Sequence, residues 1–178
     1  LRLSDRELSL LRGWLESGLP PGDLSRAPAA PQYPGGWSLG EPDLVLRSRE
    51  MTVPAIGPDR WGDIGLVPTG LTEDRYVKAV EVREINDMSG DTASTTVGGR
   101  WVFHHMTYSS GVLNEEGTGI IGDTRTRWPI HEVGRNADIF PEKFGTLLQA
   151  NSALHLGASH LHPNGIQETT AHLEFGFI

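Results

Sequence analysis

The sequence predicts an all-β body with many turns, preceded by one short helix. Glycine and proline are frequent, with 22 and 12 copies among 178 residues, and both residue types favour turns. Helical periodicity is confined to the N-terminus, whereas short stretches rich in β-branched and aromatic residues recur from residue 43 onward. A chain of this length can build one domain with a proper core and still carry an appendage.

The N-terminal helix is expected to begin after Ser4, where Ser4 and Glu7 form a capping box. The Ser4 hydroxyl can accept the backbone amide of Glu7, and the Glu7 side chain can reach back to the amide of Ser4. Gly18 and the two prolines that follow at 20–21 end the helix. One apolar stripe at helical spacing marks its packing face, and it consists of Leu8, Leu11, Trp14 and Leu15.

Residues 19–36 connect this helix to the body. They are rich in proline, glycine and alanine, a composition typical of an extended linker with polyproline II character. We therefore expect three parts: a terminal helix over 1–18, the linker over 19–36 and a β domain over 37–178.

The β domain contains several segments with strand patterns. They are residues 43–47, 51–55, 75–83, 101–108, 147–148, 153–161 and 169–178. Pro54 lacks an amide hydrogen, so the second of these segments is expected at a sheet edge. Polar, turn-rich segments lie at 86–100 and 109–127, and a turn at 162–165 joins the last two strands.

The charge and the cysteine content exclude several classes of function. Lys and Arg number 15 against 23 Asp and Glu, which gives a net charge of −8, whereas nucleic-acid binding needs clustered basic residues. No apolar run approaches the roughly 20 residues that span a bilayer, so no membrane insertion is expected. The absence of cysteine excludes disulfides, thiolate zinc sites, iron–sulfur clusters and a CxxCH haem attachment within these residues.

Two adjacent histidines, His104 and His105, stand out in the apolar stretch 101–108. A buried imidazole needs a hydrogen-bond partner or a metal, because an unpaired polar group in an apolar interior costs about 1–3 kcal/mol. A further pair, His160 and His162, ends another strand pattern, and together the two pairs suggest a metal site. Neighbouring residues point to opposite faces of a regular strand, so His104 and His105 can share one ion only if the strand is twisted or bulged, or if one binds through Nδ1.

The second pair closes an apolar stripe of alternate residues. A regular strand would place five side chains on one inward face, namely Leu154, Leu156, Ala158, His160 and His162. Because no cysteine and no paired carboxylates lie nearby, an all-imidazole site suits copper or zinc far better than magnesium or calcium. Ligand softness alone does not separate copper from zinc.

Several motifs occur in an order that carries a resemblance. They are residues 70–83, 103–106, 140–145, 160–165 and 175–178. This order resembles the first domain of the type II, ascorbate-dependent copper monooxygenases, the family of the peptidylglycine α-hydroxylating and dopamine β-hydroxylating enzymes. The opening helix and the Leu-Pro-Pro-Gly at 19–22 are similar to the end of a c-type cytochrome module, as in bacterial proteins that carry such a module before the copper domain.

The resemblance implies a jelly-roll-like antiparallel β-sandwich that holds one copper ion through His104, His105 and His160. In the family this copper is associated with electron supply, and a second copper in the following domain activates oxygen and cleaves substrate C–H bonds. The resemblance also implies an upstream cytochrome c module that contains the haem, and a small-molecule reductant or redox protein as electron donor. The segment 86–100 is longer than the bacterial pattern, and the disulfides of vertebrate members have no counterpart.

The chain is expected to be a piece of a longer polypeptide, because it starts at Leu1 rather than Met and stops at Ile178 within an apolar pattern. We expect a periplasmic or extracellular location. We also expect no turnover from the isolated chain, since the second copper domain would lie downstream of it.

Other residues could assist the site or belong to the scaffold. The candidates for further ligands, or for hydrogen-bond partners of ligands, are His162, His131 and Met106. His162 can instead cap the turn that follows it, His131 lies in a loop-like context, and Met106 is commonly a core residue. Glu132 and Asp138 could orient an imidazole.

Two alternatives of different classes stay open. One is a non-catalytic structural or interaction β-sandwich that keeps the histidines as polar core residues. The other is a zinc or copper site with its own hydrolytic or oxygen chemistry, which needs an open coordination position and a base such as Glu132.

Overall fold

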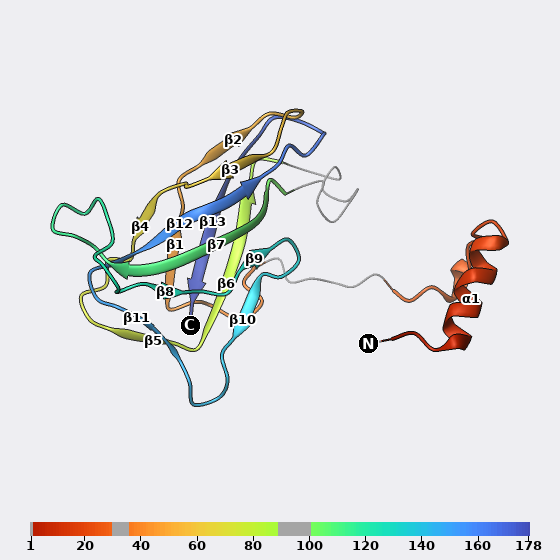
Figure 1. The fold of residues 1–178 in the computed structure, drawn as a ribbon, viewed down its shortest axis with the longest axis horizontal. Helices are drawn as coiled ribbons and strands as arrows, with labels where there is room; N and C mark the ends of the chain where they lie inside the picture. The colour runs from red at the N-terminus through yellow and green to blue at the C-terminus, as the bar shows by residue number, and fades with distance from the viewer. Residues whose placement is uncertain (1, 30–35, 89–100) are drawn as a thin grey trace. The chain divides into compact units, whose positions relative to one another are not determined.

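The structure, a computed structural model, describes residues 2–29, 36–88 and 101–178 (Figure 1). The chain divides into two compact units, residues 1–34 and residues 35–178. The first unit contains the helix α1 (Asp5–Glu16) and the 3₁₀ helix η1 (Leu24–Arg26). None of the described helices is long and apolar enough to cross a membrane.

The predicted helix and its capping box are confirmed. The Ser4 hydroxyl accepts the Glu7 amide at 3.3 Å, and the Glu7 carboxylate accepts the Ser4 amide at 2.7 Å. Gly18 adopts a positive φ of 84° just after the helix, the left-handed conformation that glycine tolerates best at a helix end. No residue of α1 is buried, so the capping bonds rather than core contacts define this helix.

The second unit is built from antiparallel strands in two main sheets. Sheet one has the order β1-β13-β6-β10, with β2 beside β13. Its strands are β1 (Leu44–Arg47), β2 (Met51–Val53), β6 (Ala79–Asn86), β10 (Ala137–Ile139) and β13 (Thr169–Phe177). Sheet two has the order β3-β12-β7-β8, with β4 beside β12 and β9 beside β7. Its strands are β3 (Arg60–Gly62), β4 (Leu66–Pro68), β7 (Phe103–Val112), β8 (Thr126–Arg127), β9 (His131–Glu132) and β12 (Ser152–Leu161).

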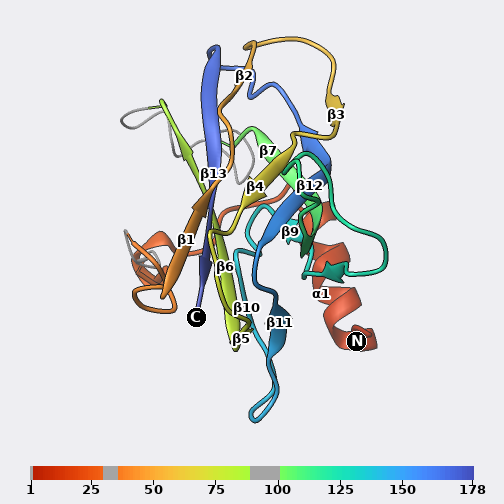
Figure 2. The ribbon, with the colours of Figure 1, turned by 90° about the vertical axis from the view of Figure 1, so that its left-hand side faces the viewer.

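The two sheets form a sandwich, and their facing sides make one hydrophobic core (Figure 2). Phe175 of sheet one and Phe103 and Leu154 of sheet two are 0–1% exposed. Removing each such side chain from water stabilises the fold by about 1.5–3 kcal/mol. The predicted all-β antiparallel class with one N-terminal helix is therefore confirmed.

Several strands differ from their predicted bounds. The predicted strand 75–83 is two strands that part at Lys78, because β5 (Arg75–Val77) pairs with β11 (Thr146–Leu148) whereas β6 pairs with β13. Strand β7 extends to Val112, into the segment predicted to be polar and turn-rich. Most of the predicted segment 86–100 lies outside the described residues.

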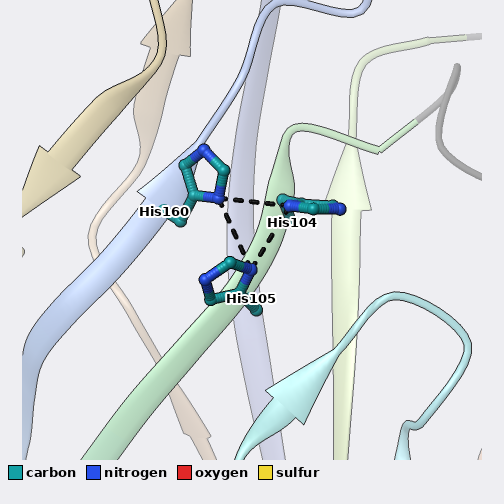
Figure 3. Close-up of side chains that lie close together, drawn as sticks. All are labelled: His104, His105 and His160. Atoms are coloured by element: carbon teal, nitrogen blue, oxygen red, sulfur yellow. Dashed lines mark hydrogen bonds between the residues drawn. The ribbon is translucent and has the colours of Figure 1, made fainter.

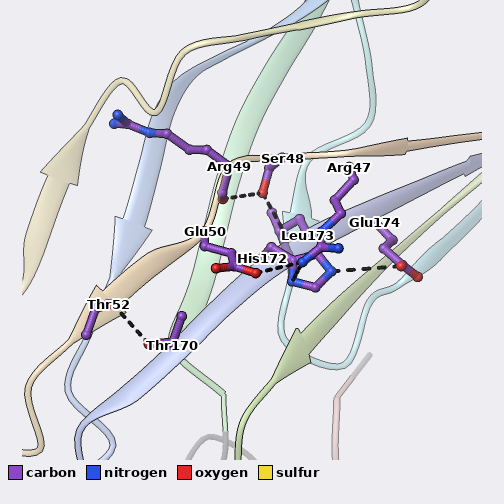
Figure 4. Close-up of polar contacts among 9 residues, drawn as sticks. All are labelled: Arg47, Ser48, Arg49, Glu50, Thr52, Thr170, His172, Leu173 and Glu174. Atoms are coloured by element: carbon purple, nitrogen blue, oxygen red, sulfur yellow. Dashed lines mark hydrogen bonds and ion pairs between the residues drawn. The ribbon is translucent and has the colours of Figure 1, made fainter.

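A polar network covers the outside of sheet one (Figure 4). Arg47 bonds to Glu50 at 2.7 Å and lies 3.3 Å from the His172 ring, whose other nitrogen is 3.8 Å from Glu174. Burial, followed by the charge of Arg47, holds the pKa of His172 below its usual range. These contacts give His172 a place in the scaffold of sheet one, away from the histidines of sheet two.

Candidate metal centre

A bulge in β7 turns two adjacent histidines toward the same face. In the pairing of β7 with β12, His105 lies opposite His160, and Phe103 lies opposite Leu161. His104 is therefore the extra residue of a β-bulge, which resets the alternation of side chains. Phe103 and Met106 are both buried in the core, so His104 and His105 lie on the outer face between them. A bulge, one of the alternatives predicted for adjacent ligands, is therefore present.

A second bulge, in β12, moves His160 onto that outer face. His155 pairs with Ser109 and Ala158 pairs with Thr107, so two residues of β12 stand against Tyr108 alone. The predicted single inward stripe is therefore wrong beyond Leu156. Leu154 and Leu156 are in the core, but the shifted register places Ala158 and His160 outside, with Ser159 and Leu161 facing inward instead.

Each of the three histidines directs its Nδ1 atom toward the Nδ1 atoms of the other two (Figure 3). The Nδ1 atoms of His104 and His160 are 3.1 Å apart, those of His104 and His105 are 3.3 Å apart, and those of His105 and His160 are 3.4 Å apart. Three ligands of a tetrahedral ion with metal–nitrogen bonds of 2.0–2.1 Å are separated by about 3.3–3.4 Å. The cluster therefore could hold a metal ion with three protein ligands and a fourth position open.

The segment at β3 orients the His160 ring. Nε2 of His160 lies 2.9 Å from a carboxylate oxygen of Asp59. A carboxylate only accepts hydrogen bonds, so Nε2 of His160 is the donor in this contact and Nδ1 is the ring nitrogen that faces the cluster. Trp61 stacks on the same ring with a centroid distance of 4.0 Å and an interplanar angle of 7°, and it makes a T-shaped contact with His105 at a centroid distance of 5.0 Å. Sequence reasoning missed both Asp59 and Trp61.

Buried Glu84 holds the backbone just before the bulge. Its carboxylate accepts the amide of Phe103 at 2.8 Å and the amide of Val102 at 3.1 Å. Charge-assisted bonds to backbone amides are among the stronger hydrogen bonds in proteins. Glu84 therefore fixes the point from which His104 and His105 project.

The surroundings favour neutral imidazole at His105. Burial, followed by the neighbouring rings of His160 and His104, holds the pKa of His105 below its usual range. The charge of Glu132, which pairs with His105 from β9, acts in the opposite direction and is the smallest of these effects. A neutral ring keeps the lone pair that a metal needs.

The remaining candidate residues lie outside the cluster. The His162 ring packs edge-on against His104 at 5.1 Å, and its buried Nε2 has no hydrogen-bond partner among the described residues. His131, expected beside the site or at the surface, is instead buried, and it pairs with the core residue Met106 on the inner side of the sheet. Asp138, predicted as a residue that could orient an imidazole, bonds to Arg135 at 2.7 Å. The carboxylate that contacts the imidazole of His160 is that of Asp59.

Comparisons of the chain with protein-family models, with curated proteins and with solved structures found no match. The function is therefore argued from the site itself. The site is a cluster of three histidines, on the outer face of a β-sandwich, that could hold a metal ion.

Proposed function

We propose that residues 35–178 form the copper-binding, electron-supplying domain of a copper-dependent, monooxygenase-like oxidoreductase. His104, His105 and His160 hold one copper ion through Nδ1. The observation that carries this proposal is the spacing of 3.1–3.4 Å among the three Nδ1 atoms, which matches three corners of a tetrahedral site.

The donor set supports copper. Three neutral imidazoles accommodate both Cu(I) and Cu(II), and the described residues offer no thiolate or carboxylate within the cluster that would favour another ion. The order of motifs along the chain points the same way, because it resembles the first domain of the copper monooxygenases. A bound copper ion would supply one-electron chemistry at this position.

Electron supply suits the position of the cluster. It lies on the outer face of sheet two, and Trp61, which is stacked on His160, is 62% exposed. Electrons would enter from a c-type cytochrome module upstream or from a small-molecule reductant, and would leave toward a second copper domain downstream. In this proposal α1 is the last helix of the cytochrome module, and the haem belongs to that module.

A fluorescence titration tests the metal site. Trp61 touches the ring of a proposed ligand, so we expect one equivalent of Cu(II) to bind and to quench tryptophan emission. Trp61→Phe should retain the stoichiometry and lose most of the quenching, whereas Trp14→Phe, in the other unit, should quench like the wild type. Failure to bind one equivalent, or equal quenching in Trp61→Phe, would contradict the proposed site.

Asp59→Asn is expected to lower copper affinity by about 10- to 100-fold, the usual effect of losing the carboxylate partner of a metal-bound histidine. Asp63→Asn is the matched control, because Asp63 makes the equivalent contact, at 2.7 Å, with Nε2 of His155 on the same strand. Competition with a chelator of known affinity measures both. Equal affinities for the two variants would show that Asp59 does not orient a ligand.

Zinc is the second candidate, with Glu132 as a base for hydrolysis. The pairing of Glu132 with His105 across β7 and β9 favours it, because this register places an acidic residue next to a proposed ligand. Repeated reduction and reoxidation of the copper-loaded protein separates the two candidates. Retention of the ion through both states supports electron transfer, and its loss on reduction favours zinc.

A further inference from the structure

A second polar site lies around His155 of β12, apart from the three histidines. We propose that the pocket lined by Arg49, Arg125 and His155 binds a small organic carboxylate. None of the residues that line it belongs to the histidine cluster, so this inference does not depend on the proposed copper function.

A chain of hydrogen bonds fixes the state of His155. Nδ1 of His155 lies 2.8 Å from a terminal nitrogen of Arg125, and Nε2 lies 2.7 Å from Asp63. A guanidinium can only donate and a carboxylate can only accept, so His155 is neutral with its proton on Nε2. Both ring nitrogens are therefore occupied, and His155 acts as a positioning residue between Asp63 and Arg125.

The bulge in β12 gives the ring its place. Gly157 sits within the bulge, and a Cβ atom there would lie 2.9 Å from Cε1 of His155. The ring therefore lies over the glycine and along the strand. A larger residue at 157 would push His155 away from Arg125.

Arg125 keeps donors for a ligand. One of its two terminal nitrogens, Nη1, lies 2.8 Å from Nδ1 of His155 and 3.4 Å from the Ser109 hydroxyl. Among the described residues, its other terminal nitrogen and Nε have no hydrogen-bond partner. Two adjacent N–H groups on one edge of a guanidinium match the two oxygens of a carboxylate.

Arg49 supplies a second positive charge. Its side chain extends away from the Arg47–Glu50–His172 network (Figure 4). It lines the pocket, lies close enough to Asp63 for its charge to favour the ionised carboxyl group, and makes no ion pair with the described residues. Two guanidinium groups against one carboxylate leave a net charge of about +1 in a protein whose net charge is −8.

The remaining walls select an organic anion. The pocket has a volume of about 570 Å³, and Leu66 and Ile120 line it together with the polar groups. Ligand pockets of this size pair apolar walls with a few polar anchors. The carboxylate of an organic monoanion would bond to one guanidinium edge while its apolar body packs on these walls. Inorganic phosphate has no apolar part to pack on Leu66 and Ile120.

Benzoate tests this site in the metal-free full chain, at fixed ionic strength. In ¹⁵N NMR spectra we expect saturable shifts of the Gly65 and Gly119 amides, which belong to residues that line the pocket. Arg125→Gln and Arg49→Gln should each weaken binding by about tenfold or more, because each removes a charged donor. Arg75→Gln is the charge-matched control, since Arg75 lies on β5 and pairs with Glu73 at the surface.

Four outcomes would overturn the proposal. The first is the absence of saturable shifts at these amides in the wild type. The second is binding of the neutral analogue benzamide as tightly as benzoate. The third is an affinity of Arg49→Gln for benzoate equal to that of the wild type, since this variant alters an exposed side chain and should fold normally. The fourth is competition by inorganic phosphate at the same affinity, which would indicate a site for any anion.

Discussion

The double variant His104→Ala, His105→Ala is expected to lose copper binding at the cluster, with an affinity more than about a hundredfold below that of the wild type. Loss of an outer partner of a ligand alone costs about 10- to 100-fold, and this variant removes two of the three proposed ligands. The remaining ligand, His160, would then hold an ion through one nitrogen. Chelator competition measures the affinity, and electron paramagnetic resonance of Cu(II) reports the loss of nitrogen ligands.

His155→Ala is the matched control for this double variant. His155 lies on β12 and on the same outer face as His160, but it belongs to the pocket of Arg125 and not to the cluster. We expect it to retain one equivalent of copper with an unchanged spectrum. Stoichiometric binding with unchanged nitrogen couplings in the double variant would place the copper elsewhere and exclude the cluster as the site.

The elements that local chemistry defines were predictable from the sequence. The capping box of Ser4 and Glu7 needs only residues three apart, and the strand patterns of 43–47 and 51–55 are visible within each segment. The division of 75–83 at Lys78 was not predictable in this way. Its cause is the choice of partners, since β5 joins β11 and β6 joins β13, both of which are far away in the sequence.

The two bulges show which part of the site could be inferred. The bulge at His104 was one of the alternatives that chemistry allowed, because adjacent ligands can share one ion only if the strand is twisted or bulged, or if one binds through Nδ1. The bulge in β12 also has a signal in the sequence. Gly157 is an isolated glycine within a strand pattern, a common mark of a bulge, and it reverses the face on which His160 lies.

Asp59 and Trp61 had no comparable signal. They belong to the segment Gly-Pro-Asp-Arg-Trp-Gly at 57–62, which has the composition of a turn. Their role depends on β3 pairing with the end of β12, so that Asp59 meets a histidine 101 residues away. Contacts of this kind are a property of the assembled sheet.

Mild acid is expected to destabilise the folded protein through His131. This ring is 4% exposed, and burial lowers its pKa to about 4, against an ordinary value of 6.5. Between these two values the unfolded chain binds the proton more readily than the native state, so stability falls as the pH falls from 6.5 to 4. The loss reaches on the order of 3 kcal/mol at pH 4 and levels off below it.

The variant His131→Leu isolates this effect. Leucine has a similar size and no titrating group, and the buried Nδ1 that it removes has no hydrogen-bond partner among the described residues. Urea unfolding at several pH values from 7 to 4, with a chelator in every sample, gives the free energy of unfolding for both proteins. Since every other titrating group is shared, the wild type should lose more stability than the variant as the pH falls through this window. Parallel curves would mean that the native state admits a proton, or water, to His131 at little cost.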